Sequence, residues 1–259
     1  MLLGRAPAPP LSAFVELLWY AEDWKPSHTQ ERHMPDGSAG LIISLRESGR
    51  VNPADLAIFG GPHSKAFLID TSEPNTIAGV QFKKGGASAF LDMPVSELHN
   101  AHVPLADLGG RSAASLRERL LEAATPVARL DLLEDWLTRR LHPERDPAVA
   151  WAVCQLERRP SLRVGDLTAH VGRSTRWFIN RFSAEVGLTP KVFGRVQRFQ
   201  LALRHAHRNA NISLADLAAS SGYFDQAHFS HDFRSIAGTT PTEYLAGRTE
   251  FLNHVAVRD

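Results

Sequence analysis

The pattern of apolar positions divides the chain into a part typical of short strands and a part typical of helices. In the first part, short apolar runs alternate with Gly, Pro and Asp, a pattern that predicts strands and tight turns. The predicted strands cover residues 14–20, 41–45, 56–59, 66–69 and 76–82. Strands this short, punctuated by turn residues, predict a small β-barrel or sandwich over residues 1–84.

From residue 86 onward the apolar residues recur at helical spacing. Leu116, Leu120 and Leu121 share one predicted helical face. Pro126 restarts a helix, whose stripe consists of leucines at positions 130, 133, 137 and 141. Two striped helices predict a helical hairpin over residues 86–142. The hairpin either covers the barrel or forms a dimer face, and the pattern does not decide between these two roles.

A polar segment rich in proline follows the hairpin and predicts a domain boundary. Residues 142–147 read His-Pro-Glu-Arg-Asp-Pro, which favours a break between residues 1–143 and 144–259. Asp146 can cap the next helix with proline at its first position. The apolar face of that helix consists of Val149, Ala152, Val153 and Leu156. We expect Cys154, in the same apolar stretch, to be a buried and inert thiol.

The helical part contains one short pattern twice. The first copy has Leu167, Gly172, Phe178, Phe182 and Gly187, and the second has Leu217, Gly222, Phe229, Phe233 and Gly238. The offset is 50 residues at the first glycine (172 to 222) and 51 residues beyond it (182 to 233). Each copy therefore predicts one supersecondary unit, and one residue is added in the turn of the second.

Each copy has the start and stop residues of helices. Ser174 and Asp225 stand where an N-cap belongs, and the two phenylalanines four apart lie on one helical face. Gly187 and Gly238 stand where a left-handed residue ends a helix. The order helix, turn, helix predicts helix-turn-helix units at residues 161–183 and 213–235, whose second helices can enter a DNA major groove.

The segment between the copies predicts one long helix. Val192, Val196, Phe199 and Leu203 form a stripe over residues 190–209. Such a helix is about 30 Å long at 1.5 Å per residue. Successive major grooves on one side of DNA lie about 34 Å apart, so a rigid helix of this length could hold two reading helices in neighbouring grooves.

Charge supports contact with a polyanion. The whole chain has a formal net charge of only +1, but residues 160–210 contain nine Lys or Arg and two acids, 9 − 2 = +7. The composition is that of an ordinary globular protein, with 43% hydrophobic residues. One cysteine excludes an internal disulfide framework, and no signal-peptide or membrane-spanning pattern is present, so we expect a cytoplasmic protein without membrane contact.

The second copy resembles the AraC/XylS family of bacterial transcription regulators. The resemblance is carried by residues 214–218, 221–223, 225–230, Phe233 and 238–244, and it covers residues 147–248. The first copy matches less fully, with Thr168 in place of the usual alanine and Asn180 where a basic residue is common. The family implies an α+β architecture: an N-terminal sensing and dimerisation domain, then an all-α domain of two helix-turn-helix units joined by a linker helix.

The resemblance also implies which side chains contact double-stranded DNA. Arg176 could bond guanine in bidentate fashion and Asn180 adenine, whereas Ile179 could only make apolar contact. The base-reading positions expected in both copies are Arg176, Ile179, Asn180, Gln226, Ala227 and Ser230. The phosphate contacts expected are Arg173, Arg181, Arg195, Arg198, His231 and Arg234. Other candidate partners implied by the family are RNA polymerase, a small-molecule effector and a second copy of the chain.

The competing hypothesis is a metal-binding or enzymatic β-barrel that uses the helical half as a scaffold. Its candidate ligands would be His28, His33 and His63, which lack the close spacing typical of metal sites. The sequence contains no phosphate-binding loop and no nucleophile elbow. It also contains no paired carboxylates in an obvious relation to a base. The sequence therefore predicts no cofactor, no metal and no catalytic residue, and favours a regulator over an enzyme.

Overall fold

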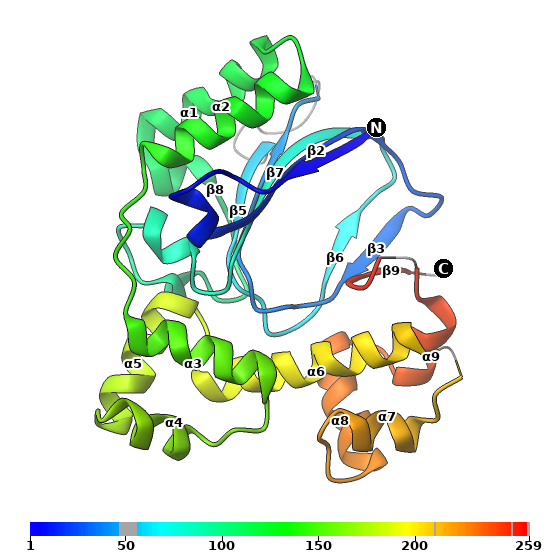
Figure 1. The fold of residues 1–259 in the computed structure, drawn as a ribbon. Helices are drawn as coiled ribbons and strands as arrows, with labels where there is room; N and C mark the ends of the chain where they lie inside the picture. Colours follow the sequence, from blue (N-terminus) through cyan, green and yellow to red (C-terminus); the bar gives the residue numbers. More distant parts are fainter. Residues whose placement is uncertain (47–55, 210, 250, 258–259) are drawn as a thin grey trace.

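The computed structural model describes residues 1–46, 56–209, 211–249 and 251–257. A six-stranded antiparallel sheet forms most of the first half (Figure 1). Its strands, in spatial order, are β1 (Leu2–Arg5), β2 (Val15–Trp24), β7 (Asn75–Phe82), β4 (Gly40–Ser44), β5 (Ala57–Gly60) and β8 (His102–Pro104). Each of the five predicted strands is present, with ends displaced by a few residues.

A second sheet combines strands from the two ends of the sequence. Its order is β6 (Phe67–Asp70), β3 (Gln30–His33) and β9 (His254–Ala256). In the antiparallel pairing of β3 with β9, His33 lies opposite His254. The last strand of the described chain is therefore part of a sheet whose other strands come from the first half.

The two sheets face each other and remain separate, so the described strands form no closed barrel. The predicted α+β class is confirmed: a sheet-rich first half precedes a helical second half (Figure 1). The sequence pattern did not predict β1, β3, β8 and β9, each of which is only three or four residues long.

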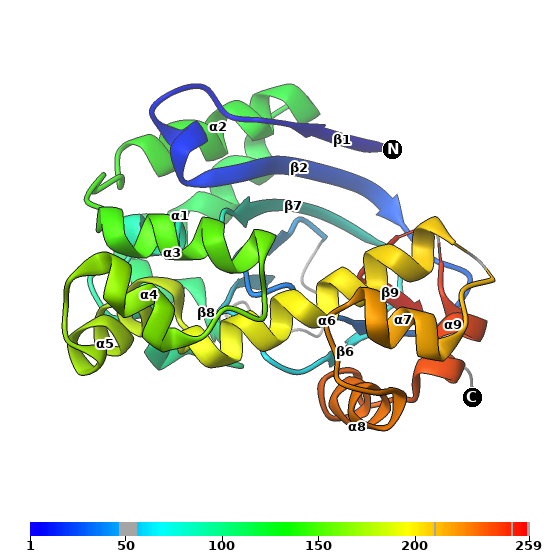
Figure 2. The same ribbon diagram turned by 60° about the horizontal axis from the view of Figure 1, so that its bottom comes forward.

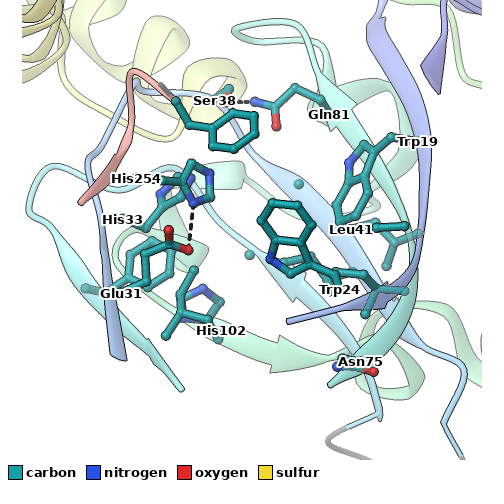
Figure 3. A pocket seen from close by; sticks show the side chains of 18 of the residues that line it. Trp19, Trp24, Glu31, His33, Ser38, Leu41, Asn75, Gln81, His102 and His254 are labelled. Atoms are coloured by element: carbon teal, nitrogen blue, oxygen red, sulfur yellow. Dashed lines mark hydrogen bonds and ion pairs between the residues drawn. The ribbon is translucent and has the colours of Figure 1, made fainter. Parts of the chain in front are cut away.

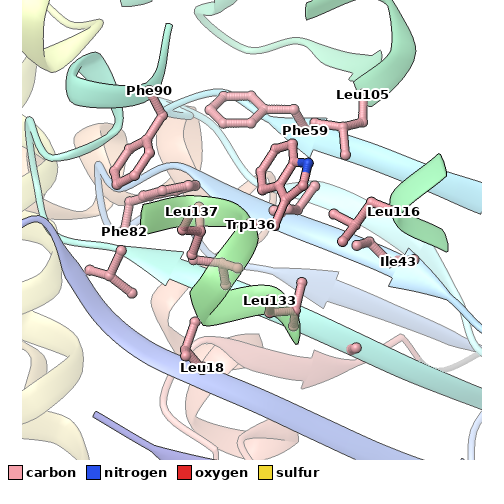
Figure 4. Packing of buried hydrophobic residues seen from close by; sticks show 14 of the residues in the cluster. Leu18, Ile43, Phe59, Phe82, Phe90, Leu105, Leu116, Leu133, Trp136 and Leu137 are labelled. Atoms are coloured by element: carbon pink, nitrogen blue, oxygen red, sulfur yellow. The ribbon is translucent and has the colours of Figure 1, made fainter. Parts of the chain in front are cut away.

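The helical hairpin covers one face of the six-stranded sheet. It consists of α1 (Leu105–Glu122) and α2 (Pro126–Thr138). Figure 4 shows Leu116, Leu133 and Leu137 packed among side chains from the strands, and all three are fully buried. The prediction that Leu121 shares the buried face is wrong, because Leu121 is 40% exposed. The short 3₁₀ helices η1 (Leu11–Ala13), η3 (Ala87–Phe90) and η4 (Val95–Leu98) lie near the sheet.

The second half is built of helices, with no strand between residue 147 and β9 among the described residues. These helices are α3 (Pro147–Arg158), α4 (Val164–Val171), α5 (Thr175–Val186), α6 (Pro190–Arg208), α7 (Leu214–Ser220), α8 (Gln226–Ala237) and α9 (Pro241–Gly247). Within the described residues, no helix is both long and apolar enough to cross a membrane.

The two helix-turn-helix units form separate small cores at opposite ends of α6 (Figures 1 and 2). Phe178, Phe182 and Phe193 belong to the first core, in which Val149 and Leu156 of α3 are also buried. The second core contains Phe229 and Phe233, together with Met34 from the first half of the chain. Cys154 corrects another prediction: it is exposed, because it lies on the side of α3 away from that buried face.

Candidate nucleic-acid interface

The first helix-turn-helix unit consists of α4 and α5. Gly172 ends α4 in the left-handed conformation, with φ of 68°. The Ser174 hydroxyl then accepts a hydrogen bond from the Trp177 N–H at 3.3 Å and caps α5, as the sequence predicts. Because Phe178 and Phe182 are buried, the opposite side of α5 faces outward.

The outward side of α5 carries the three residues predicted to read bases. Arg176 and Asn180 are exposed, and Ile179 is half-buried. They lie within the first half of α5, the part of a recognition helix that normally contacts base edges. The geometry thus leaves these side chains accessible to a DNA groove, and their contacts with bases stay a prediction.

The second unit consists of α7 and α8, and its turn contains the added residue. Asp225 caps α8 by accepting a hydrogen bond from the His228 N–H at 2.7 Å. Between Gly222 and this cap stand two residues, where the first unit has only Arg173 before its cap. Tyr223 is buried in the second core, whereas Phe224 is 92% exposed. The insertion therefore places an aromatic ring on the surface beside the start of α8, a feature that sequence reasoning missed.

The predicted contacts of the second unit also face outward. Gln226 and Ala227 are exposed at the first turn of α8, and Ser230 is half-buried. The two predicted phosphate contacts of this helix, His231 and Arg234, are exposed as well. Their order along the helix resembles that of the first unit, as expected for two copies of one motif.

The predicted phosphate contacts differ in how strongly they interact with other side chains of the protein. Arg173 is exposed, and its guanidinium lies 5.2 Å from the centre of the Trp177 ring. Arg181 forms an ion pair with Glu185 at 2.8 Å and a longer one with Asp146 at 3.4 Å. Burial raises the pKa of Glu185 more than the charge of Arg181 lowers it.

Arg195 and Arg198 make the strongest interactions with other side chains of the protein. Both lie on α6 and both form ion pairs with Asp232 of α8, a residue that is 6% exposed. The guanidinium of Arg198 also lies 4.5 Å from the centre of the Tyr223 ring. These two arginines therefore hold α8 against α6, and phosphate contact by either residue stays a prediction.

Helix α6 sets the distance between the two units. Its 19 residues run from Pro190 to Arg208, which corresponds to about 28 Å at 1.5 Å per residue. Thr189 caps its start, with proline at the first position. Because α4–α5 and α7–α8 lie at opposite ends of this helix (Figures 1 and 2), α6 separates α5 from α8.

The first half of the chain contacts both units. At the end of α5, Gly187 adopts φ of 83°, and a Cβ built on it would come within 2.6 Å of Pro62 and 2.9 Å of Val95. On α6, Gln197 and Gln200 are buried and donate hydrogen bonds to the carbonyl oxygens of Asp36 and Pro35, each at 2.8 Å. Helices α5 and α6 are therefore packed directly on the sheet-rich half.

A cavity of about 490 Å³ lies between the two sheets (Figure 3). Trp19, Trp24 and Leu41 line it from the six-stranded sheet, and Glu31, His33 and His254 line it from the three-stranded sheet (Figure 3). A volume of this size is typical of small-molecule sites in proteins.

Histidine rings gather around Phe67 in this cavity. The rings of His33, His63 and His102 have centroids 5.0, 4.5 and 4.6 Å from that of Phe67. Burial, together with the charges of neighbouring histidines, lowers the pKa of His33 and of His63 to about 4. Both side chains are therefore neutral at pH 7. Among the described residues, no three His, Cys, Asp or Glu side chains lie close enough together to hold a metal ion.

Sequence reasoning missed this cluster because its members come from separate elements. His33 lies on β3, His63 follows β5, His102 lies on β8 and His254 lies on β9. No spacing along the chain reveals a site of this kind, since it exists only once the sheets have formed. A weak signal was present in the many histidines, of which the chain has 12.

The chain matches two protein families, one in each half. Residues 4–104 match a domain of unknown function, DUF6597, and residues 167–247 match a family described as helix-turn-helix domain. The second match includes α5, α6 and α8 completely. The predicted resemblance of the C-terminal part to AraC-type regulators is thereby confirmed.

Two curated proteins are similar to parts of the sequence. A Streptomyces lividans protein described as an AraC-like transcription regulator is 40% identical over 103 residues, which are 38% of this chain and 33% of that protein. The arabinose operon regulatory protein of Escherichia coli K12 is 27% identical over 139 residues, 50% of this chain and 47% of the relative. The chain thus spans a third to about a half of these relatives.

Two solved structures are similar at low sequence identity. ToxT from Vibrio cholerae O395 superposes over 96% of this chain and 97% of its own, with a TM-score of 0.44 and 12% identity. The C-terminal domain of AraT from Geobacillus stearothermophilus covers 41% of this chain and 91% of its own, with a TM-score of 0.38 and 19% identity.

Proposed function

We propose that this chain, whose C-terminal part is a helix-turn-helix domain of the AraC type, is a sequence-specific transcription regulator that binds double-stranded DNA. The observation that carries the proposal is the pair of helix-turn-helix units at the two ends of α6. In each unit the second helix buries two phenylalanines and exposes polar side chains on its other side. This is the arrangement that major-groove recognition requires.

In the proposed complex, α5 and α8 enter neighbouring major grooves on one side of the duplex. Arg176, Asn180 and Gln226 are exposed, carry hydrogen-bonding groups and would read bases. Ile179, Ala227 and Ser230 would make apolar or short-range contacts in the same grooves. Arg173, His231 and Arg234 are exposed and would contact phosphates and fix the register.

The sheet-rich half would act as the sensing part of the regulator. It contains the 490 Å³ cavity, and it packs on α5 and α6 through Gly187, Gln197 and Gln200. A small molecule bound in the cavity could therefore shift the position of the reading helices. The division at residues 143 and 144 separates these two roles in the sequence, although the sheets and helices share a core through Met34.

Selection of bound sequences from random duplex DNA with the full chain tests the function. We expect enrichment of a site with two half-sites about one helical turn apart, because α6, which separates α5 from α8, is about 28 Å long. Affinity for the selected site should fall steeply as salt is raised, since neutralised phosphates release counterions. Failure to enrich any sequence, with no retention of duplex DNA at low salt, would reject the proposal.

The metal-binding or enzymatic alternative receives no support from the relatives, which are described as regulators. Metal analysis of the purified protein tests it separately. A stoichiometric metal ion would revive the alternative, whereas a metal-free protein that retains sequence-specific DNA binding would favour the regulator.

A further inference from the structure

We propose that the cavity between the sheets binds a flat aromatic molecule that carries no negative charge, and that this ligand bridges the sheet-rich half and the C-terminal segment by contacting Phe251. The inference rests on the proposed function, because it names the effector class of that regulator.

The six-stranded sheet gives the cavity a flat aromatic wall. Along β2, Leu18 and Tyr20 point into the core between the six-stranded sheet and the helical hairpin, whereas Leu17 and Trp19 line the cavity. Trp19 lies opposite Gly79 of β7, and a Cβ built on Gly79 would come within 2.3 Å of the indole. The indole therefore lies directly over the glycine, where any larger residue would displace it.

Several large apolar side chains in the cavity remain accessible. Leu17 and Trp24 are each 37% exposed, and Ile42 and Phe251 are each 38% exposed, and all four line the cavity. Covering apolar surface stabilises a complex by roughly 25 cal/mol per Å². An apolar, planar ligand between Trp19 and Trp24 would be stabilised both by burial of this apolar surface and by aromatic stacking.

The charges around the cavity exclude an anionic ligand. Of the described residues that line it, none is Lys or Arg, whereas four are acids: Glu31, Asp36, Asp70 and Glu73. Burial alone would raise the pKa of Glu31, but hydrogen bonds and charge interactions with His254 and His28 bring it below its ordinary value, so Glu31 is ionised at pH 7. A carboxylate ligand would therefore meet negative charge and no permanent cation, while a neutral or cationic ligand would not be repelled.

Two neutral histidines provide the polar contacts. The Nδ1 atom of His33 and the Nε2 atom of His63 are buried and have no hydrogen-bond partner within the protein. A buried polar atom without a partner costs free energy, and a ligand that supplies one recovers that cost. A hydroxyl, carbonyl or amide group on the aromatic ligand would satisfy either atom, since a neutral imidazole has one donor and one acceptor.

The C-terminal segment forms part of the wall and is tied to the DNA-binding helices. The ring of Phe251 packs edge-on against Trp24, with centroids 5.9 Å apart. Next to it, the Leu252 carbonyl accepts a hydrogen bond from the Tyr244 hydroxyl of α9, at 3.3 Å. The Asn253 side-chain oxygen accepts one from Gln200 of α6, at 2.8 Å. A ligand that contacts Phe251 therefore acts on a segment held by α6 and α9.

Three probes with the same ring and different charges test the ligand class. Indole-3-acetamide is neutral, tryptamine is cationic and indole-3-acetate is anionic at pH 7. In calorimetric titrations of the full chain, we expect the acetamide or the tryptamine to bind at least tenfold more tightly than the acetate. Binding of the acetate with equal or higher affinity, or the absence of binding by all three at millimolar concentration, would overturn the proposal.

Matched variants test the bridging contact. Phe251→Ala and Trp24→Ala should each weaken binding of the best probe at least fivefold. Leu68→Ala is the control. Leu68 lies on β6 between Phe67 and Ile69, which line the cavity, but its own side chain is on the opposite face of the strand and is 54% exposed. Unchanged probe affinity in folded Phe251→Ala, verified by circular dichroism, contradicts the bridging role.

DNA binding of the same preparations separates this inference from the function on which it rests. A wild-type chain that binds its selected DNA site but none of the probes contradicts only the ligand class. For the bridging role, amide hydrogen exchange supplies a second readout: the probe should slow exchange of the Met34 amide, which donates to the Asn253 carbonyl at 2.8 Å. Unchanged exchange there with bound probe would overturn the bridge.

Discussion

Arg195 of α6 and Asp232 of α8 form an ion pair that ties α8 to α6. Asp232 is 6% exposed and also lies 3.5 Å from Arg198. A buried carboxylate of this kind is stabilised mainly by its partners, and removing them leaves its charge uncompensated. The orientation of α8 relative to α6 thus depends on a charge contact as well as on the packing of Phe199 against Phe233.

The ion pair gives the first prediction. Asp232→Asn should lower the free energy of unfolding by about 1–3 kcal/mol, because two arginines lose their charged partner. This loss is smaller than that expected for a fully buried ion pair, because the side chain of Arg195 is 37% exposed. Urea denaturation measures it. The control is Asp135→Asn, whose ion pair with Arg139 is exposed and contributes at most about 0.5 kcal/mol. Equal effects of the two substitutions would contradict a structural role for Asp232.

Base reading by α5 gives the second prediction. Arg176→Ala should weaken binding to the selected site by about 1–3 kcal/mol and relax the preference at one base pair, because a bidentate contact with guanine is lost. Quantitative binding to the site and to its single-base variants measures both effects. An equal loss on every sequence would instead assign Arg176 to the phosphate backbone.

Phosphate contact by the first unit gives the third prediction. Arg173→Ala should weaken binding similarly on all sequences and reduce the slope of log affinity against log salt by about one. Arg195→Ala serves as a contrast: it should reduce stability, with a smaller change of the salt slope, since this guanidinium is already paired with Asp232. If Arg195→Ala changed the slope as much as Arg173→Ala, the linker helix would contact phosphates directly.

The contact between α5 and the sheet-rich half gives the fourth prediction. Gly172 and Gly187 both have positive φ, but only Gly187 has neighbours, Pro62 and Val95, within 3 Å of an added Cβ. Gly172→Ala should therefore cost about 1–2 kcal/mol from backbone strain alone. Gly187→Ala should cost roughly 1–3 kcal/mol more because of the steric clash. Denaturation of the two variants in parallel measures the difference in their free energies of unfolding. Equal losses of stability would show that Pro62 and Val95 move aside without cost.

Protonation of the cavity histidines gives the fifth prediction. Burial, with the charges of His102, His33 and His99, lowers the pKa of His63 to about 4 against an ordinary value of 6.5, and only Asp36 opposes the shift. Below pH 6.5 the unfolded chain therefore binds a proton that the folded chain excludes, so stability falls as pH decreases from 6.5 to about 4. The loss from His63 approaches about 3 kcal/mol at 1.36 kcal/mol per pKa unit.

Thermal unfolding between pH 7 and pH 5 checks this dependence. His63→Gln should make stability less sensitive to pH over that range, because the titrating group is gone. His142→Gln replaces an exposed histidine and should leave the dependence unchanged. A pH dependence that is the same in His63→Gln and in the wild type would contradict the role of His63.

Local signals in the sequence were sufficient for the helical half. Ser174, Thr189 and Asp225 are caps, and Gly187 and Gly238 are left-handed ends, because these residues act through their own backbone and their nearest neighbours. The second sheet could not be predicted in the same way. His254 pairs with His33 across more than two hundred intervening residues, and β9 is only three residues long, so neither strand has a pattern of its own.

The predicted site residues show the same limit. Exposure of Arg176, Asn180 and Gln226 follows from helical periodicity once the two phenylalanines are placed in the core. The engagement of Arg195 and Arg198 with Asp232 depends on how α8 packs on α6, which the spacing of residues along one helix does not reveal. The cavity was missed for the same reason, since residues from both sheets form it.

The position of Met34 has a consequence for how such chains can evolve. This residue of the first half is fully buried in the core of the second helix-turn-helix unit, and β9 completes a sheet of the first half. A recombination that exchanged only one half with a related gene would leave a hole where Met34 sits and a strand without its neighbour. New pairings of a sheet-rich half with a helical half must therefore arise by inheriting both surfaces together or by compensating changes on each side.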